Sequence, residues 1–117
     1  MKVSVVIANY NNSKFIKECI ESLNNQTYKN IEIIFFDDNS QDNSLEVINK
    51  YKNIKIIENK IQTKFGSFNQ MNAFKKSIQS STGDIIFLLD SDDFFRKDKI
   101  EKIMDFFLKN NNENIVF

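Results

Sequence analysis

The sequence predicts an α/β fold, with a mostly parallel β-sheet and helices on both faces. Short continuous apolar runs, typical of strands buried on both sides, alternate along the chain with segments whose apolar residues recur every three or four positions, as on one side of a helix. Strands joined by helical crossovers pair in parallel. With 117 residues, 41% of them hydrophobic, the chain is expected to form one domain.

The first half of the chain predicts two strands, each followed by a helix. The strands are expected at 3–8 and 31–36, and the helices over 13–23 and 45–51. The first helix carries an apolar stripe that includes Cys19, with charged residues on its other side. Asp42 or Ser40 is expected to cap the second helix, because a side-chain oxygen there can accept a hydrogen bond from a free helical N–H group.

The second half continues this alternation. We expect a third strand at 54–57, a loop over 59–65, a helix from Gly66 or Ser67 to residue 78, a fourth strand at 85–89 and a last helix over 100–108. Gly83 and Asp84 interrupt the helical pattern before the fourth strand. Residues 115–117 predict the start of a fifth strand.

Composition and charge exclude several classes of function. The 16 basic and 16 acidic residues give zero net charge, so the basic excess of a nucleic-acid-binding protein is missing and no nucleic-acid partner is expected. The single cysteine, Cys19, cannot form an internal disulfide, which indicates a reducing, cytoplasmic compartment, and its place on the apolar stripe predicts a core residue. No apolar run approaches the ~20 residues that cross a bilayer, so no transmembrane segment is expected.

Polar clusters directly follow three of the predicted strands. Asn9-Tyr10-Asn11 follows the first strand, Asp37-Asp38 the second and Asp90-Ser91-Asp92-Asp93 the fourth. In open α/β sheets, ligands bind beyond the carboxyl ends of the strands. We therefore expect the three clusters to form a single site at one edge of the sheet.

The acidic cluster after the fourth strand is the strongest chemical signal. Its carboxylates repel one another, which a fold tolerates best when a cation lies between them. Asp90 and Asp92 can both bind one hard cation, and Mn²⁺ or Mg²⁺ suits them because each takes oxygen ligands and keeps phosphate oxygens in its shell. A diphosphate would complete that shell. The alternative is a solvated acidic turn in which Asp93 or Asp98 caps the next helix.

The other two clusters suit a nucleobase. A carboxylate of Asp37 or Asp38 can accept the imide N–H of uracil; the alternative is a residue that only caps a helix or turns the chain. Tyr10 can lie against a flat base; the alternative is a buried tyrosine that closes the end of the core.

With these motifs in register, the chain resembles the family 2 glycosyltransferases with the GT-A fold. The resemblance covers nearly the whole chain and rests on four stretches, 3–11, 22–28, 32–40 and 83–93. It implies that residues 1–117 are the Rossmann-like, nucleotide-sugar-binding half of a bacterial enzyme of polysaccharide biosynthesis. Such an enzyme uses a divalent metal, Mn²⁺ or Mg²⁺, and transfers the sugar of a UDP-sugar, with inversion, to a glycan or lipid-linked acceptor. It also implies a cytoplasmic protein, peripheral at the inner face of the membrane.

Site residues carry over from the family onto matching positions. The predicted nucleotide-sugar-binding residues are Ala8, Tyr10, Asp38, Asp90, Ser91 and Asp92, with Asp92 and Asp90 as metal ligands. In the family, the position of Asp38 contacts uracil and that of Tyr10 helps to form the base pocket. The position of Asp92 binds the metal, while those of Asp90 and Ser91 lie near the ribose and diphosphate.

Three departures from the family pattern matter. Ala8 stands where many members have proline and Asn9 where threonine is common, and these two affect the details of the base pocket. Members are also longer, and their second half binds the acceptor and supplies the general base. The base is therefore expected downstream of Phe117, and the chain alone is expected to be inactive. An exposed apolar edge where that half would join predicts a homodimer or poor solubility.

Two other functions remain open from the sequence. One is a non-catalytic module that binds a nucleotide sugar. The other is a haloacid dehalogenase-like phosphatase, because that class also uses an apolar strand that ends in Asp-x-Asp, although normally on its first strand.

Overall fold

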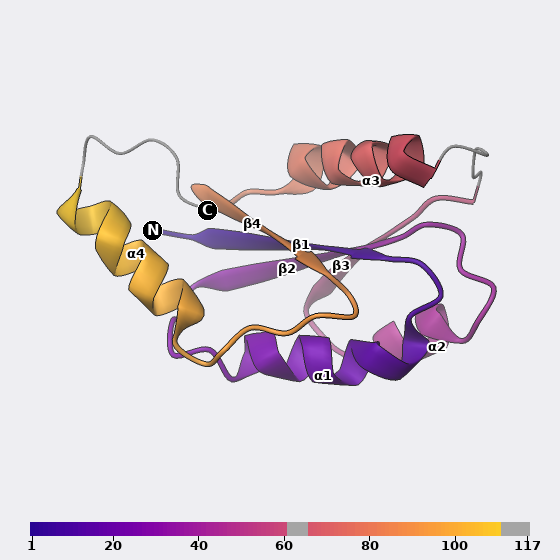
Figure 1. Cartoon of the computed structure of the whole chain (residues 1–117), viewed down its shortest axis with the longest axis horizontal. Coiled ribbons are helices and arrows are strands. Elements are labelled where there is room, and N and C mark those ends of the chain that lie inside the picture. Colours follow the sequence, from indigo (N-terminus) through magenta and orange to yellow (C-terminus); the bar gives the residue numbers. More distant parts are fainter. Residues whose placement is uncertain (61–65, 111–117) are drawn as a thin grey trace.

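The computed structural model describes residues 1–60 and 66–110. Its elements are β1 (Val3–Asn9), α1 (Ser13–Asn24), β2 (Ile31–Asp37), α2 (Ser44–Ile48), β3 (Ile54–Glu58), α3 (Gly66–Ser80), β4 (Ile85–Asp90) and α4 (Lys99–Lys109). The strands form a parallel sheet in the order β3-β2-β1-β4 (Figure 1). This confirms the predicted α/β class. The fifth strand predicted at 115–117 and most of the loop predicted over 59–65 lie outside the described residues.

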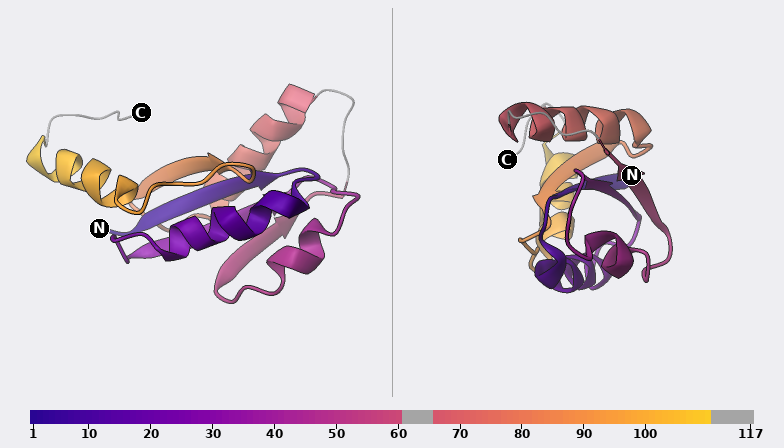
Figure 2. Two further views of the ribbon diagram at one scale, coloured as in Figure 1. Left: turned by 60° about the horizontal axis from the view of Figure 1, so that its bottom comes forward. Right: turned by 90° about the vertical axis from the view of Figure 1, so that its right-hand side faces the viewer.

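Helices cover both faces of the sheet, as the sequence predicts. Figure 2 shows α1 and α2 on one face and α3 on the other. The main core lies on the face of α1, where alternate strand residues such as Val5, Phe35 and Phe87 pack against buried residues of α1, α2 and α4. On the face of α3, the buried apolar residues include Val6, Ile34, Phe36 and Ala73. The sheet therefore has apolar side chains on both sides, which explains the continuous apolar runs in its central strands.

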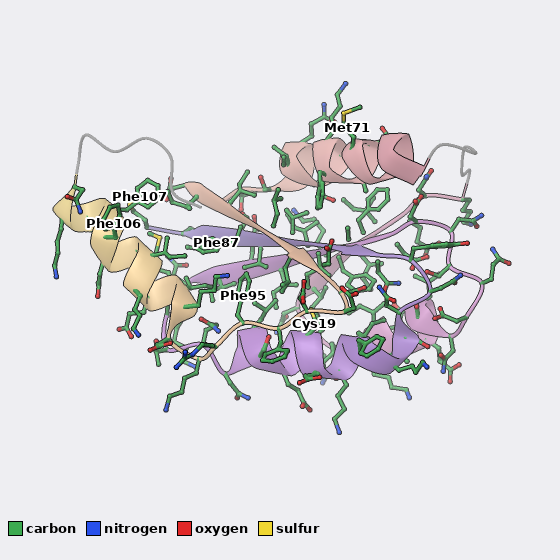
Figure 3. The ribbon with its side chains drawn as sticks, in the orientation of Figure 1. Cys19, Met71, Phe87, Phe95, Phe106 and Phe107 are labelled. Carbon is green, nitrogen blue, oxygen red and sulfur yellow. The ribbon has the colours of Figure 1, made fainter. Side chains whose placement is uncertain are left out.

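Phe95 and Cys19 join the main core, whereas Phe94 does not. The Phe95 ring meets the Phe87 ring edge-on, with 6.1 Å between the ring centroids (Figure 3). The Cys19 thiol is fully buried, and burial raises its pKa to about 12, helped by the negative charges of Asp92 and Asp93. Cys19 is thus a core residue, as predicted.

The edge strand β4 carries apolar side chains that the described residues do not cover. Ile86 and Leu88 lie on the face of α3, and Leu88 is 51% exposed. Phe94, on the loop that follows, is also exposed. No helix in the described part of the chain is long and apolar enough to cross a membrane.

Helix α2 is shorter than predicted. It ends at Ile48, so Tyr51, which we expected on this helix, lies beyond it. The backbone explains the early end, because Lys50 and Tyr51 donate hydrogen bonds to carbonyls three residues back, the tight pattern that closes a helix. Asn53 then takes a left-handed conformation with φ of 63° as the chain turns into β3.

Asp42 stabilises the start of two helices with one carboxylate. It accepts hydrogen bonds from the backbone N–H of Ser44, the first residue of α2, and from that of Ser13, the first residue of α1, each at 3.0 Å. Burial alone would raise the pKa of Asp42, but the hydrogen bonds from Ser44 and Ser13 outweigh it and lower the pKa. The N-cap residue of α2 is Asn43, so neither Asp42 nor Ser40 occupies the predicted cap position, and the backbone and hydroxyl of Ser40 bind Asp37 instead.

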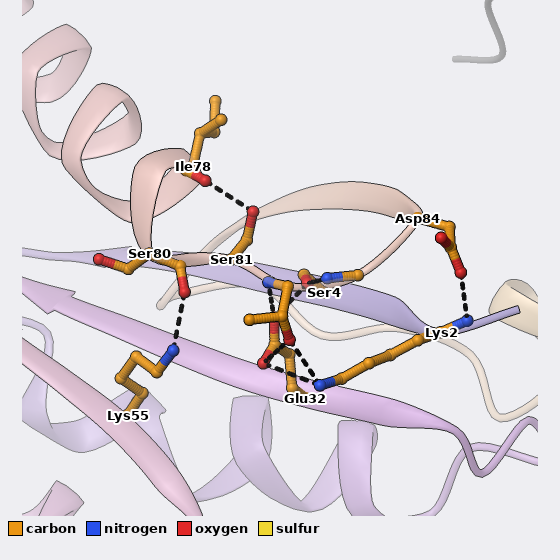
Figure 4. A network of polar contacts seen from close by, with 10 residues as sticks. Lys2, Ser4, Glu32, Lys55, Ile78, Ser80, Ser81 and Asp84 are labelled. Carbon is orange, nitrogen blue, oxygen red and sulfur yellow. Dashed lines mark hydrogen bonds and ion pairs between the residues drawn. The ribbon is translucent and has the colours of Figure 1, made fainter.

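The amino end of the sheet is held by a polar network around Glu32. Its carboxylate accepts hydrogen bonds from the Ser4 hydroxyl and from the backbone and side chain of Thr82, and it pairs with Lys2 (Figure 4). Gly83 follows directly, with its N–H on the Ser4 hydroxyl at 2.8 Å. A Cβ at this position would lie 2.6 Å from the backbone nitrogen of Ser4, so only glycine allows this close approach of the chain to β1.

Candidate functional site

The carboxyl end of the sheet brings together the three segments that the sequence singles out. The backbone N–H of Asp38 donates to the carbonyl of Asn9 at 2.9 Å, and that of Ser91 donates to the carbonyl of Ala8 at 3.1 Å. The ends of β2 and β4 are thus fastened to β1, which lies between them. From β1 the chain adds β2 and then β3 on one side, and it then crosses back to add β4 on the other side of β1. The strand order therefore reverses between β1 and β4, and open α/β sheets bind ligands at such a switch point.

The acidic cluster forms a compact group of oxygens at this edge. One carboxylate oxygen from each of Asp90, Asp92 and Asp93 lies within 4.8 Å of the others, and all three residues are exposed. Partial burial of Asp90 raises the pKa of its carboxyl, and the charges of Asp92 and Asp93 raise it further. Asp98 occupies the N-cap position of α4 but makes no side-chain cap bond, and its carboxylate pairs with Lys102 instead. A cation between the carboxylates would relieve their repulsion, and three carboxylate oxygens fit a hard divalent ion such as Mn²⁺ or Mg²⁺.

Ser91 lies between these carboxylates in the chain but points the other way. Its side chain is fully buried, and its hydroxyl donates to Oδ1 of Asn9 at 2.7 Å. It also accepts a hydrogen bond from Nδ2 of Asn12 at 3.1 Å. The contacts of Ser91 are therefore with the loop after β1, and its predicted place near a ribose or diphosphate stays a prediction.

The two aspartates after β2 have different environments. Asp37 is 1% exposed, and its carboxylate accepts hydrogen bonds from Asn9 and from the backbone and hydroxyl of Ser40, so it turns the chain. Asp38 comes next, and its carboxylate accepts a hydrogen bond from Nδ2 of Asn59, at the end of β3, at 2.9 Å. Of the two, Asp37 takes the structural role that we considered as the alternative, which leaves Asp38 as the candidate for base recognition.

The first polar cluster presents its aromatic ring to solvent. Tyr10 is 44% exposed, so the alternative of a buried tyrosine closing the core is wrong. Asn11 beside it has a left-handed backbone, with φ of 53°, and its N–H donates to the Ser40 hydroxyl. Ala8 is half-buried within β1, paired with Phe36 on one side and with Asp90 on the other.

An open hollow lies on the outer side of β4 beside the acidic cluster. Its volume is about 490 Å³, and its lining includes Asp90, Asp93, Leu88 and Phe94. Lys99 also lines it, with its ammonium 4.3 Å from the centre of the Phe95 ring. A hollow of this size is in the range of small-ligand sites.

Three asparagines around the site were not singled out for roles by sequence reasoning. Asn9 joins Asp37 to Ser91, Asn12 binds Ser91, and Asn59 binds Asp38. The signals for Asn9 are its position, as a polar residue that ends a buried strand, and its departure from the threonine that is common in the family. Nothing local marks Asn59, because its contact depends on the pairing of β3 with β2.

Comparison with known proteins identifies the family to which the chain belongs. The sequence matches glycosyl transferase family 2 over residues 4–117. The chain belongs to this family. The phosphatase alternative is therefore dropped.

Relatives and solved structures agree with this assignment. The UDP-Glc:alpha-D-GlcNAc-diphosphoundecaprenol beta-1,3-glucosyltransferase WfaP of Escherichia coli is 39% identical over 104 residues, which are 89% of this chain and 40% of that protein. The crystal structure of S. aureus TarS 1–349 matches 100% of this chain and 38% of its own, with 25% identity and a TM-score of 0.80, and TarS has also been solved in complex with UDP-GlcNAc. The mannosyltransferase PcManGT of Pyrobaculum calidifontis, in complex with GDP-Man and Mn²⁺, shares the fold at 17% identity and a TM-score of 0.79, over 91% of this chain and 32% of its own.

These likenesses establish a Rossmann-like GT-A fold. The chain spans between 18% and 43% of the length of eight curated relatives that it matches.

Proposed function

We propose that residues 1–117 are the donor-binding part of a glycosyltransferase that binds a UDP-sugar together with Mn²⁺ or Mg²⁺. The observation that carries this proposal is the group of carboxylates of Asp90, Asp92 and Asp93, placed at the switch point of a family 2 fold. In the proposed complex, Asp92 and Asp90 hold the metal and, through it, the diphosphate. A divalent cation at this position neutralises charge that develops on the departing nucleoside diphosphate.

The base would be bound on the other side of β1. Asp38 would accept the imide N–H of uracil, and the exposed ring of Tyr10 would lie against the base. Asn59 supports this role of Asp38 because its amide fixes the direction of the carboxylate. The half-buried Ala8 lies between the two halves of the site, in the strand that separates Asp38 from Asp90.

The rest of the reaction is proposed for a part of the protein outside residues 1–117. A carboxylate there would deprotonate the hydroxyl of a glycan or lipid-linked acceptor, which then displaces the nucleoside diphosphate with inversion at the sugar. The chain alone is thus expected to bind the donor and to transfer little or no sugar. A non-catalytic module that binds a nucleotide sugar would have the same site. The two functions differ in one result, because joining the chain to an acceptor-binding half would give sugar transfer for a glycosyltransferase and none for a non-catalytic module.

The metal role is tested by titrating UDP into the 117-residue chain in a calorimeter, with and without Mn²⁺. Mn²⁺ should raise the affinity for UDP, and Asp92→Asn should remove about a factor of ten or more of that gain, as expected for the loss of one charged contact. Asp105→Asn is the matched control, because Asp105 is exposed on α4 and the charge change is the same. UDP affinity that does not depend on Mn²⁺, or an equal effect of the two substitutions, would contradict the proposal.

The base role is tested by comparing UDP with CDP. Cytosine has no imide N–H at the position where uracil has one, so the wild-type chain should prefer UDP. Asp38→Ala should lower the affinity for UDP and leave that for CDP nearly unchanged. If Asp38→Ala keeps the preference for UDP, then another group recognises the base.

A further inference from the structure

The side chain of Asn9 lies between the two loops of the proposed site. Its Nδ2 donates to Oδ1 of Asp37 at 2.8 Å and to the hydroxyl of Ser40 at 3.2 Å. Its Oδ1 accepts the hydroxyl of Ser91 at 2.7 Å. One amide therefore connects the loop that carries Asp38 to the loop that carries the acidic cluster.

Chemistry fixes the direction of this amide. A carboxylate can only accept hydrogen bonds, so the NH₂ group of Asn9 must face Asp37, and its oxygen then faces the Ser91 hydroxyl, which can donate. Asn9 is 2% exposed, Asp37 1% and Ser91 0%, so none of these bonds can be replaced by water without rearrangement. With so little exposure, the Asn9 side chain is not placed to touch a ligand.

We propose that Asn9 is a positioning residue that couples the nucleobase loop to the metal loop. This inference rests on the proposed function, in which Asp38 contacts the base and Asp92 the metal. The separation between base and diphosphate is set by the nucleotide itself, so the two loops must be held at a matching separation before binding if both contacts are to form at full strength. Backbone hydrogen bonds already hold each loop to β1, and Asn9 adds the side-chain link between the two loops.

The coupling can be measured with ligands that use one loop or both. Uridine lacks the diphosphate and therefore does not use the metal, whereas UDP with Mn²⁺ engages both loops. Two quantities are compared between variants. The first is the metal factor, defined as the ratio of the UDP affinities with and without Mn²⁺, and the second is the affinity for uridine. Both are measured by calorimetry on the full 117-residue chain.

Asn9→Ala should lower the metal factor about tenfold, the effect of losing the one buried hydrogen bond that joins Asn9 to the metal loop through Ser91, while the affinity for uridine changes much less. Ser4→Ala is the matched control. Ser4 lies in the same strand, is also fully buried, and its hydroxyl binds Glu32 and Gly83 at the opposite end of the sheet. If Asn9 only stabilised the fold, both variants would unfold more easily and both would keep the wild-type metal factor. That result would overturn the inference.

Ser91→Ala provides a second test, because it removes the link to the metal loop and keeps the contact of Asn9 with Asp37. It should lower the metal factor as Asn9→Ala does, and an unchanged metal factor in Ser91→Ala counts against the inference even if Asn9→Ala does not fold. A wild-type chain whose UDP affinity is independent of Mn²⁺ would overturn the proposed function and this inference together. A wild-type metal factor that survives in Ser91→Ala and in any folded Asn9→Ala would overturn this inference alone.

Discussion

Replacing Glu32 with glutamine should destabilise the fold without touching the site, because Glu32 lies at the amino end of the sheet. Its carboxylate joins three segments that are distant in sequence. It accepts the Ser4 hydroxyl from β1 and the N–H and hydroxyl of Thr82 from the segment before β4, and its Oε2 lies 3.4 Å from the ammonium of Lys2. Glutamine has only one acceptor oxygen and no charge, so it cannot keep all of these contacts.

The size of the effect follows from the pKa of Glu32. Burial by itself would raise that pKa, but the hydrogen bonds from Ser4, Thr82 and Lys2 outweigh it and lower the pKa from 4.5 to about 2. At about 1.4 kcal/mol per pKa unit, this shift corresponds to at most about 3.5 kcal/mol. Lys2 is 41% exposed and its charge is screened by solvent, so we expect a loss of about 1–2 kcal/mol for Glu32→Gln at pH 7.

The pH dependence gives the sign of the effect. The pKa is lower in the folded than in the unfolded state, so the contribution of Glu32 is complete above about pH 4.5 and is lost as the pH falls toward 2. Urea unfolding of wild type and Glu32→Gln at pH 7 and at pH 2 should therefore show a gap that largely closes in acid. Glu18→Gln, on the exposed side of α1, is the control. A gap of the same size at both pH values, or no gap at pH 7, would refute this account of the network.

Three further predictions concern single positions. Gly83→Ala should lower the free energy of unfolding by about 1–3 kcal/mol or more in urea titrations, because its Cβ would meet the backbone nitrogen of Ser4 at 2.6 Å; unchanged stability would show that the two segments separate easily. Cys19 should resist a disulfide reagent such as dithionitrobenzoate in the native chain and react fully in urea, since it is buried and its pKa is raised to about 12; rapid native reaction would mean that α1 opens readily. Leu88→Lys should reduce self-association of the chain in light scattering, because Leu88 is exposed on the edge strand β4; a wild-type chain that is already monomeric at high concentration would refute the predicted homodimer.

The strands and most helices could be predicted because their signals are local. Continuous apolar runs identified β1 and β2, and helical spacing identified α1 and α4. The predicted end of α2 is wrong because Tyr51 fits the helical spacing, although the helix ends at Ile48 and the chain has already turned at Tyr51. Spacing reports which residues would share a helical face, but not where backbone hydrogen bonding stops.

The site was predictable to the level of segments but not of individual contacts. The rule for parallel sheets placed the clusters after β1, β2 and β4 at one edge, and the structure brings them together there. The sequence could not tell which of Asp37 and Asp38 turns the chain, because that depends on Asn9 and Ser40 reaching Asp37 across the sheet. Neighbouring carboxylates look alike until the fold supplies their hydrogen-bond partners.

The spacing of the acidic cluster has its own structural reason. Along β4 the side chains alternate between buried and exposed, and this alternation continues past the strand, with Leu89 buried, Asp90 exposed, Ser91 buried and Asp92 exposed. Asp90 and Asp92 are both exposed, with carboxylate oxygens within 4.8 Å of each other, and the position between them requires a residue that can be buried while still hydrogen-bonding to β1. Serine meets this need because its hydroxyl is small and both donates to Asn9 and accepts from Asn12. The pattern Asp-Ser-Asp therefore combines two possible metal ligands with the anchor that fixes them to the centre of the sheet.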